Sequence, residues 1–150
     1  SSVTYVGTGE EARLVKIYHN IILGIYTQAL AEILVLGEKG GVKREAIMEF
    51  INSSVMGCMF SQYKTPALVN LDFNPTFTPV LLRKDFDLGL SESDKHEVPM
   101  PITNAVRDIV DSCIDRGYAE DDFSTLLLIA AANAGVTLTS ESADVKDGLN

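Results

Sequence analysis

The sequence predicts an all-α fold of about six helices arranged around one long central helix. Residues 9–39 contain no proline, and their apolar side chains surround nearly the whole circumference of a helix, which is typical of a buried one. Each later segment up to residue 134 also places apolar residues at helical spacing. Glycines and prolines fall between these segments, for example at Gly40-Gly41, where helices commonly end.

The remaining elements follow from spacing and capping signals. We expect further helices at residues 42–54, 55–66, 80–96, 102–116 and 123–134. Thr78 and Pro79 suit the N-cap and first turn of the helix at 80–96, and Asp121 or Asp122 suits the cap of the last helix. Residues 68–79 are expected to be irregular. In the short helix at 55–66 we expect inward-facing apolar side chains, namely Met56, Met59 and Phe60.

The length of 150 residues suits one domain with one core. We expect a lead-in at residues 1–8 with a short strand or extended run, a helical domain at 9–135, and a disordered polar tail at 136–150. The chain lacks an initiator methionine and its strand-like start stands alone. We therefore expect it to be a fragment whose N-terminal portion is absent.

Composition excludes several classes of function. A net charge of −9 repels phosphate backbones, so we expect no nucleic-acid partner. The most apolar windows, residues 21–36 and 126–134, contain Gln28 and Glu32 or are too short, so we expect no membrane span. No residues have metal-ligand spacing. Cys58 and Cys113 are expected to be buried free thiols in a reducing compartment, with a cytoplasmic location and an organelle matrix as the alternative.

A glycine motif precedes the long helix. Gly7, Gly9 and Ala12 match the G-x-G-x-x-A dinucleotide fingerprint, but that fingerprint requires a second parallel strand with an acidic residue about 20 positions on. The following residues continue as helix, and Glu10 and Glu11 place carboxylates where a pyrophosphate would bind. We therefore reject this motif as a cofactor site and assign the two glutamates to the helix N-terminus.

Three polar residues interrupt the apolar surface of the long helix. Lys16, His19 and Asn20 lie at i, i+3 and i+4, so they project from one face within one turn. One interpretation is a polar stripe that meets solvent. The other is a site in which Lys16, desolvated by its apolar neighbours Ile17 and Ile21, exchanges protons with a substrate.

A second cluster lies on the helix at 80–96. Lys84 and Asp85 are adjacent, which more often indicates a surface pair than a site. Phe77, eight residues before Asp85, is more often a core residue than a wall of a binding site. His96 lies near Asp94 and Glu97 at the helix end and is expected to be a solvated surface histidine.

Four motifs in order carry a resemblance to a known family. They are VGTG with VKIYHN at residues 6–9 and 15–20, Phe77 with LLRKDFDLGL at 81–90, VPMP at 98–101, and GY with DDFS at 117–118 and 121–124. Together they resemble the C-terminal helical domain of the β-hydroxyacid dehydrogenases, which include 3-hydroxyisobutyrate dehydrogenase and 6-phosphogluconate dehydrogenase. The resemblance covers roughly residues 3–134 and implies the C-terminal domain of the 6-phosphogluconate dehydrogenase-like fold.

The resemblance implies a function for each polar cluster. Lys16 matches the catalytic acid/base lysine, while His19 and Asn20 match substrate-binding positions. Lys84, Phe77 and Asp85 match positions beside the nicotinamide end of NAD or NADP. The implied reaction is hydride transfer between the nicotinamide and a small 3-hydroxyacid or semialdehyde. The implied assembly is a homodimer whose N-terminal Rossmann domain, absent here, binds most of the cofactor.

Two departures from the family pattern narrow the assignment. Most 3-hydroxyisobutyrate dehydrogenases have Asn-Asn where this chain has His19-Asn20, as 6-phosphogluconate dehydrogenase does. Leu23 stands where 6-phosphogluconate dehydrogenase has its second acid, and this chain lacks that enzyme's longer C-terminal domain. The chain therefore resembles the short-chain branch of the family. The alternative function is a non-enzymatic helical oligomerisation module derived from the family, for which an upstream Rossmann half would be unnecessary.

Overall fold

The computed structural model describes residues 3–149, and within them the chain is entirely helical with irregular connections. A π-helical turn, Ile114–Tyr118, follows α5, and a 3₁₀ turn, Phe123–Thr125, precedes α6. No strand occurs in this range, including residues 3–8, so the all-α prediction is confirmed for it. The six α-helices are α1 (Glu11–Lys39), α2 (Arg44–Ser53), α3 (Met59–Asn70), α4 (Pro79–Lys95), α5 (Pro101–Cys113) and α6 (Leu126–Asn133).

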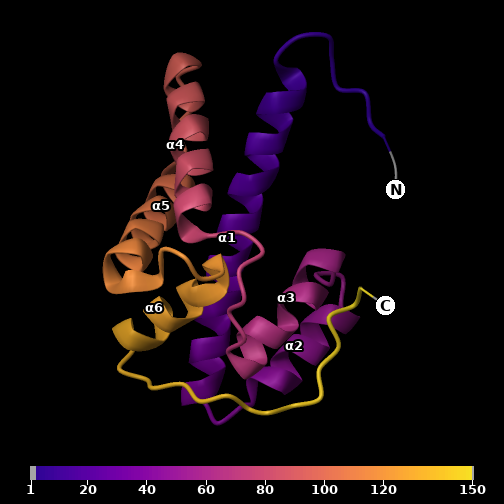
Figure 1. Cartoon of the computed structure of the whole chain (residues 1–150), viewed down its shortest axis with the longest axis vertical. Coiled ribbons are helices and arrows are strands. Elements are labelled where there is room, and N and C mark those ends of the chain that lie inside the picture. The colour runs from indigo at the N-terminus through magenta and orange to yellow at the C-terminus, as the bar shows by residue number, and fades with distance from the viewer. Residues whose placement is uncertain (1–2, 150) are drawn as a thin grey trace.

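Helix α1 runs along the length of the molecule (Figure 1). Helix α4 accompanies its upper half with α5 beside it, whereas α6, α2 and α3 surround its lower half (Figure 1). Two apolar clusters fill the space between these helices. One contains Ile17 and Ile21 of α1 with Leu82 and Phe86 of α4, and the other is built on the C-terminal half of α1.

Two glycines bring α1 and α4 into close contact. A Cβ atom on Gly24 of α1 would lie 2.6 Å from a ring carbon of Phe86, which is too close for any side chain. A Cβ atom on Gly89 of α4 would collide with Ile21. A side chain at either position would force Phe86 or Ile21 to move, so the two glycines permit this close interhelical contact.

The length and apolar composition of α1 alone would allow it to cross a membrane. Half of its most apolar 18-residue stretch is nevertheless buried inside the domain. Such burial is typical of a core helix, and it covers Leu30, Ala31 and Leu34, which the second apolar cluster encloses.

The α2–α3 connection differs from the prediction. Met56 and Met59 are exposed, and only Phe60 is buried. The helix that contains it runs from Met59 to Asn70 with Pro66 inside it, so the irregular link to α4 is limited to residues 71–78. Cys58 at the start of α3 is also exposed, which corrects the prediction of two buried thiols, whereas Cys113 is buried and burial raises its pKa.

The tail after α6 packs against the domain, contrary to the expected disorder. Both carboxylate oxygens of Glu141 accept backbone N–H bonds at the N-terminus of α2, from Arg44 at 2.8 Å and Glu45 at 3.0 Å. Arg44 is 1% exposed, and its guanidinium donates to the carbonyl oxygens of Leu68 and Thr139. The polar tail is held because it satisfies groups that α2 and α3 would otherwise bury unpaired.

Candidate active site

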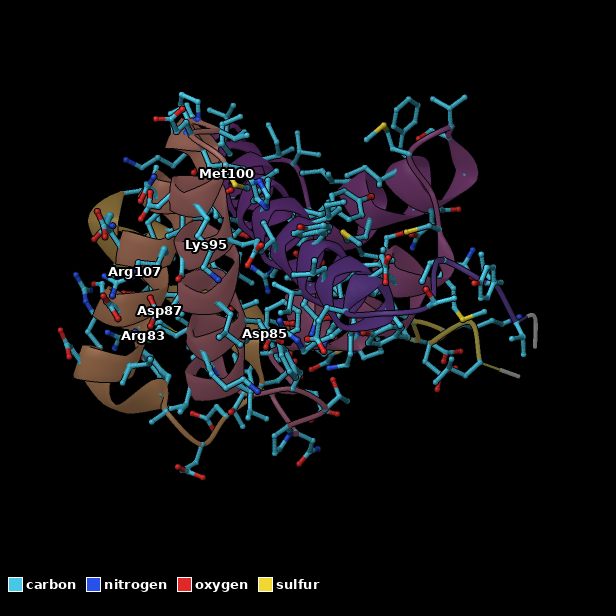
Figure 2. All side chains as sticks on the ribbon, turned by 90° about the horizontal axis from the view of Figure 1, so that it is seen from above. Arg83, Asp85, Asp87, Lys95, Met100 and Arg107 are labelled. Carbon is cyan, nitrogen blue, oxygen red and sulfur yellow. The ribbon has the colours of Figure 1, made fainter. Side chains whose placement is uncertain are left out.

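The close contact of α1 and α4 places Asn20 beside Asp85. The Asn20 Nδ2 atom donates a hydrogen bond of 2.6 Å to Asp85 Oδ2, and both residues are buried. Asp85 projects from α4 toward α1, whereas Arg83 and Asp87 on the same helix lie toward Arg107 of α5 (Figure 2). The structure therefore joins two residues that are 65 positions apart in the chain and that the sequence predicts for one site.

Two exposed cationic or ionisable side chains flank this buried pair. His19 Nδ1 lies 3.2 Å from Asn20 Oδ1, so the Asn20 amide is held at both of its polar atoms. Lys84 Nζ lies 3.5 Å from Asp85 Oδ1. Four of the six predicted site residues are thus connected by short polar contacts across the α1–α4 boundary.

Lys16 lies one helical turn before Asn20 on the same face of α1. Its side chain is exposed, and within residues 3–149 it forms no ion pair or side-chain hydrogen bond. The expectation that Ile17 and Ile21 desolvate it is wrong, because both isoleucines turn away into the apolar core. Lys16 is therefore available on an open face, and this chain alone does not remove it from water.

Phe77 lies at the other end of α4, immediately before the N-cap residue Thr78. Its ring is partly buried and meets Phe123 edge to face with centroids 5.8 Å apart. Its carbonyl oxygen accepts a hydrogen bond of 2.9 Å from the backbone N–H of Phe123. The residue is therefore fixed by the turn before α6 rather than by α1.

One buried polar pair was missed by the sequence analysis. Lys64 on α3 and Asp122 before α6 form an ion pair of 2.7 Å with both side chains almost fully enclosed. Asp122 was expected only as a helix cap, a function it also performs by accepting from the N–H of Ser124. Little in the sequence indicated this ion pair. Lys64 lies close to Pro66, where its helix was predicted to end, so it was not expected to be buried.

The face formed by Lys16, Asn20, Lys84 and Asp85 is suited to a small polar molecule that carries a hydroxyl and a carboxylate. Lys16 supplies an exposed amine, and Asn20 supplies an oriented amide with a second N–H available. No group of three or more metal-ligating side chains occurs in residues 3–149. The face is open rather than enclosed, so it has the geometry of one wall of a site.

Comparison with known proteins identifies the family. Residues 9–130 match the family model described as "NAD-binding of NADP-dependent 3-hydroxyisobutyrate dehydrogenase". The chain belongs to this family. NAD or NADP is therefore the cofactor class. The description assigns NAD binding to the matched region itself, whereas the sequence analysis expected most cofactor contacts in an absent N-terminal domain.

Similar proteins include both enzymes and a nuclear factor. The chain is 30% identical over 138 residues to 2-(hydroxymethyl)glutarate dehydrogenase from Eubacterium barkeri, covering 91% of this chain and 46% of that protein. It is 25% identical to the cytokine-like nuclear factor N-PAC from Aedes aegypti, covering 84% of this chain and 22% of that protein. It spans about half the length of the dehydrogenases and reductases that it matches.

The fold is shared with solved members of the family. The crystal structure of 3-hydroxyisobutyrate dehydrogenase from Salmonella typhimurium superimposes with a TM-score of 0.78 at 21% identity. The superposition covers 86% of this chain and 46% of that chain. This likeness establishes the helical fold, and the proteins that resemble the chain in sequence are the basis for the activity proposed below.

Proposed function

We propose that this chain is the C-terminal, substrate-binding and dimerising domain of an NAD(P)-dependent hydroxyacid dehydrogenase. The observation that carries the proposal is the buried Asn20–Asp85 hydrogen bond with Lys16 and Lys84 exposed on the same face. An isolated buried carboxylate is costly unless it is paired, so a buried amide–carboxylate pair at an open face indicates a group held for binding. The chain spans about half the length of its dehydrogenase relatives, and we propose that a second domain covers this face.

Charged side chains on and beside this face both favour and oppose a phosphate-bearing cofactor. Lys84 is an exposed cation beside the site, in a chain whose net charge is −9. At the N-terminus of α1, five residues before Lys16, Glu11 accepts from the N–H of Gly9 at 2.6 Å, so a carboxylate occupies the position where a phosphate would bind a glycine-rich turn. NAD or NADP, when bound, supplies the hydride acceptor or donor, and Lys84, Phe77 and Asp85 would contact its nicotinamide end.

The proposed chemistry is proton transfer coupled to hydride transfer. In the oxidative direction, neutral Lys16 takes the proton of the substrate hydroxyl while the hydride leaves the adjacent carbon. In the reductive direction, the Lys16 ammonium donates a proton to the developing alkoxide. Asn20 donates a hydrogen bond to the substrate without competing for that proton, and His19 and Asp85 hold its amide in place.

The exposure of Lys16 adds a condition to this mechanism. Proton transfer between Lys16 and a substrate requires that bulk water be kept away from both groups. We propose that the second domain and the substrate together cover Lys16. The active site is then complete only when this helical face is closed from the other side, a common arrangement at domain boundaries.

A non-enzymatic oligomerisation module remains the second candidate function, because one relative is named a nuclear factor. Such a module requires only apolar faces for assembly. It gives no reason to bury Asp85 against Asn20 or to place two lysines around them. The polar architecture of the α1–α4 face therefore favours the enzyme.

Activity of the full-length protein tests the proposal. Purified protein would be assayed with NAD and with NADP against a panel of small 3-hydroxyacids, and in reverse against the corresponding semialdehydes. We expect cofactor-dependent turnover of at least one member, followed at the absorbance of the reduced nicotinamide. Absence of turnover with every pair, together with absence of NAD(P) binding, would favour the oligomerisation module. We further propose a cytoplasmic or organelle-matrix location, with no nucleic-acid or membrane partner.

A further inference from the structure

The buried pair of Lys64 and Asp122 is the most enclosed charge pair recorded in residues 3–149. The two side chains are 3% and 1% exposed, and Lys64 Nζ donates to both Asp122 oxygens at 2.7 Å. Lys64 Nζ also lies 4.7 Å from the centre of the Phe123 ring and 5.0 Å from that of Tyr63. Because desolvating two charges costs free energy that the attraction often only balances, stability alone does not explain such a pair.

The hydrogen bonds of Asp122 connect three separate segments. Its Oδ2 atom accepts from the backbone N–H of Thr76 at 3.0 Å and from the Thr76 hydroxyl at 2.9 Å. Its Oδ1 atom accepts from the N–H and the hydroxyl of Ser124 at 3.0 and 2.7 Å. The Asp122 carboxylate therefore connects α3, the 71–78 link and the turn before α6 through hydrogen bonds.

Two backbone hydrogen bonds extend this connection toward the site. The N–H of Asp122 donates to the carbonyl oxygen of Phe73 at 3.0 Å, and the N–H of Phe123 donates to that of Phe77 at 2.9 Å. The Phe77 ring also rests on Phe123. The 71–78 link thus has few anchors of its own and is positioned by residues that immediately surround Asp122.

We propose that Lys64 and Asp122 are a positioning pair that sets the Phe77 ring and the entry to α4 for cofactor binding. This inference rests on the proposed function, in which Phe77 lies beside the nicotinamide end of NAD(P). Helix α4 itself is held on α1 by Leu82 and Phe86, so the pair is not needed to place Asp85. Its effect is confined to the link that carries Phe77.

The chain contains a matched control for this proposal. Arg44 is a second buried cation, 1% exposed, which pairs with Glu38 at 2.7 Å and donates to the carbonyl oxygens of Leu68 and, in the tail, Thr139. Its hydrogen bonds and ion pairs involve none of residues 71–78 and none of the proposed site residues. A general loss of stability should follow from Arg44→Met, whereas a positional effect on Phe77 should not.

Hydrogen exchange of the full-length protein tests the structural half of the proposal without any activity. We would compare Lys64→Met, Asp122→Asn, the double variant and Thr76→Val, which removes only the hydroxyl of an exposed residue. We expect faster exchange of the amides of Thr76, Asp122 and Phe123, with unchanged protection of α1 and α4. Equal loss of protection throughout the domain, or none in residues 71–78, would overturn the proposal.

Steady-state kinetics of the same variants test the functional half. We expect KM for NAD(P) to rise about tenfold in Thr76→Val while kcat stays within about twofold, since small misplacements of binding groups cost up to about 10²-fold. Arg44→Met should lower the melting temperature and leave KM unchanged. Equal KM values in Thr76→Val and wild type would overturn the positioning role. An inactive wild type would instead contradict the proposed function. The exchange measurement would still show whether Lys64 and Asp122 position the 71–78 link.

Discussion

Lys16 and Asn20 share one face of α1, yet their environments are opposite. Asn20 is buried and hydrogen-bonded at both polar atoms, whereas Lys16 extends into solvent. A substrate that reaches both would bind an oriented amide and a mobile amine one helical turn apart. Removing each side chain should therefore affect different steps of the proposed reaction.

In the full-length enzyme, Lys16→Ala should lower kcat by roughly 10²–10⁴-fold, the usual contribution of general acid–base catalysis. The affinity for NAD(P) should barely change, because the proposed cofactor contacts come from Lys84, Phe77 and Asp85. Because the Lys16 side chain is exposed, the melting temperature should also stay unchanged. Near-native kcat at saturating substrate would show that Lys16 is only part of a solvated stripe.

Two neighbouring substitutions serve as comparisons for that result. Lys84→Ala should weaken cofactor binding first, since the Lys84 ammonium is the exposed cation beside Asp85. Asn20→Ala should raise KM for the substrate and lower kcat together, because it removes a binding group and leaves Asp85 buried without its amide donor. The same kinetic change in all three variants would argue against separate functions.

The pH dependence of stability should report on Asp122. Burial by itself raises the pKa of this carboxyl, but the hydrogen bond and charge of Lys64 and the donors of Ser124 outweigh it, so the pKa lies below its ordinary value of 3.8. The stabilisation is complete above the unfolded-state pKa and is lost as pH falls through the lower, folded-state pKa. We expect Asp122→Asn to be less stable at pH 7 and to lose less stability on acidification, as measured by urea unfolding between about pH 2 and 7. An identical acid slope in both proteins would contradict this.

At the level of elements, apolar spacing was sufficient to locate the helices. The starts and ends of α1, α2 and α4 lie within about two residues of their predicted positions, the usual uncertainty at helix ends. Thr78 and Pro79 begin α4 as expected because N-cap and first-turn preferences are local. The polar tail could not be predicted to pack, because its anchor is the contact of Glu141 with α2, which lies almost 100 residues away.

The geometry around the proposed site residues was less predictable from the sequence than the helices were. Asn20 and Asp85 meet because Gly24 and Gly89 permit close packing, a consequence that no local pattern expresses. The exposure of Lys16 was mispredicted because the apolar residues beside it in sequence point to the other side of the helix. Lys64 was overlooked because its partner Asp122 lies 58 positions later.

Helix α1 also carries an exposed apolar stripe. Val15, Tyr18 and Ile22 are spaced by three and four residues, Ile33 and Leu36 by three, and each is at least 42% exposed. An uncovered stripe of this length marks an interaction surface. The exposed members are Val15, Tyr18, Ile22, Ile33 and Leu36.

We expect this stripe to form the proposed homodimer, so Ile22→Lys should shift the protein toward monomer in sedimentation at micromolar concentration. Ile22 is 64% exposed, and its replacement should not unfold the domain. Val55→Lys is the matched control, because Val55 is 99% exposed and lies outside α1. A monomeric wild type, or dissociation by both substitutions, would contradict a dimer through α1.

At the scale of the whole molecule, this chain supplies only one wall of the proposed site. Lys16, His19 and Lys84 are exposed on the same face, and the chain spans about half the length of the dehydrogenases it matches. The helical domain can nevertheless hold its own fold, because its two apolar clusters and its tail are satisfied by residues of the same chain. Folding and catalysis should therefore be separable.

The 150-residue chain purified alone should fold and show no dehydrogenase activity. Its far-ultraviolet circular dichroism should be that of a helical protein, because residues 11–133 are mostly helix. Turnover should be absent, since Lys16 is exposed to solvent and an open face cannot orient the nicotinamide against a hydroxyl. Adding the second domain in trans, or restoring it in the full-length chain, should recover activity. Turnover of a hydroxyacid with NAD or NADP by the isolated chain would show that this face is a complete site.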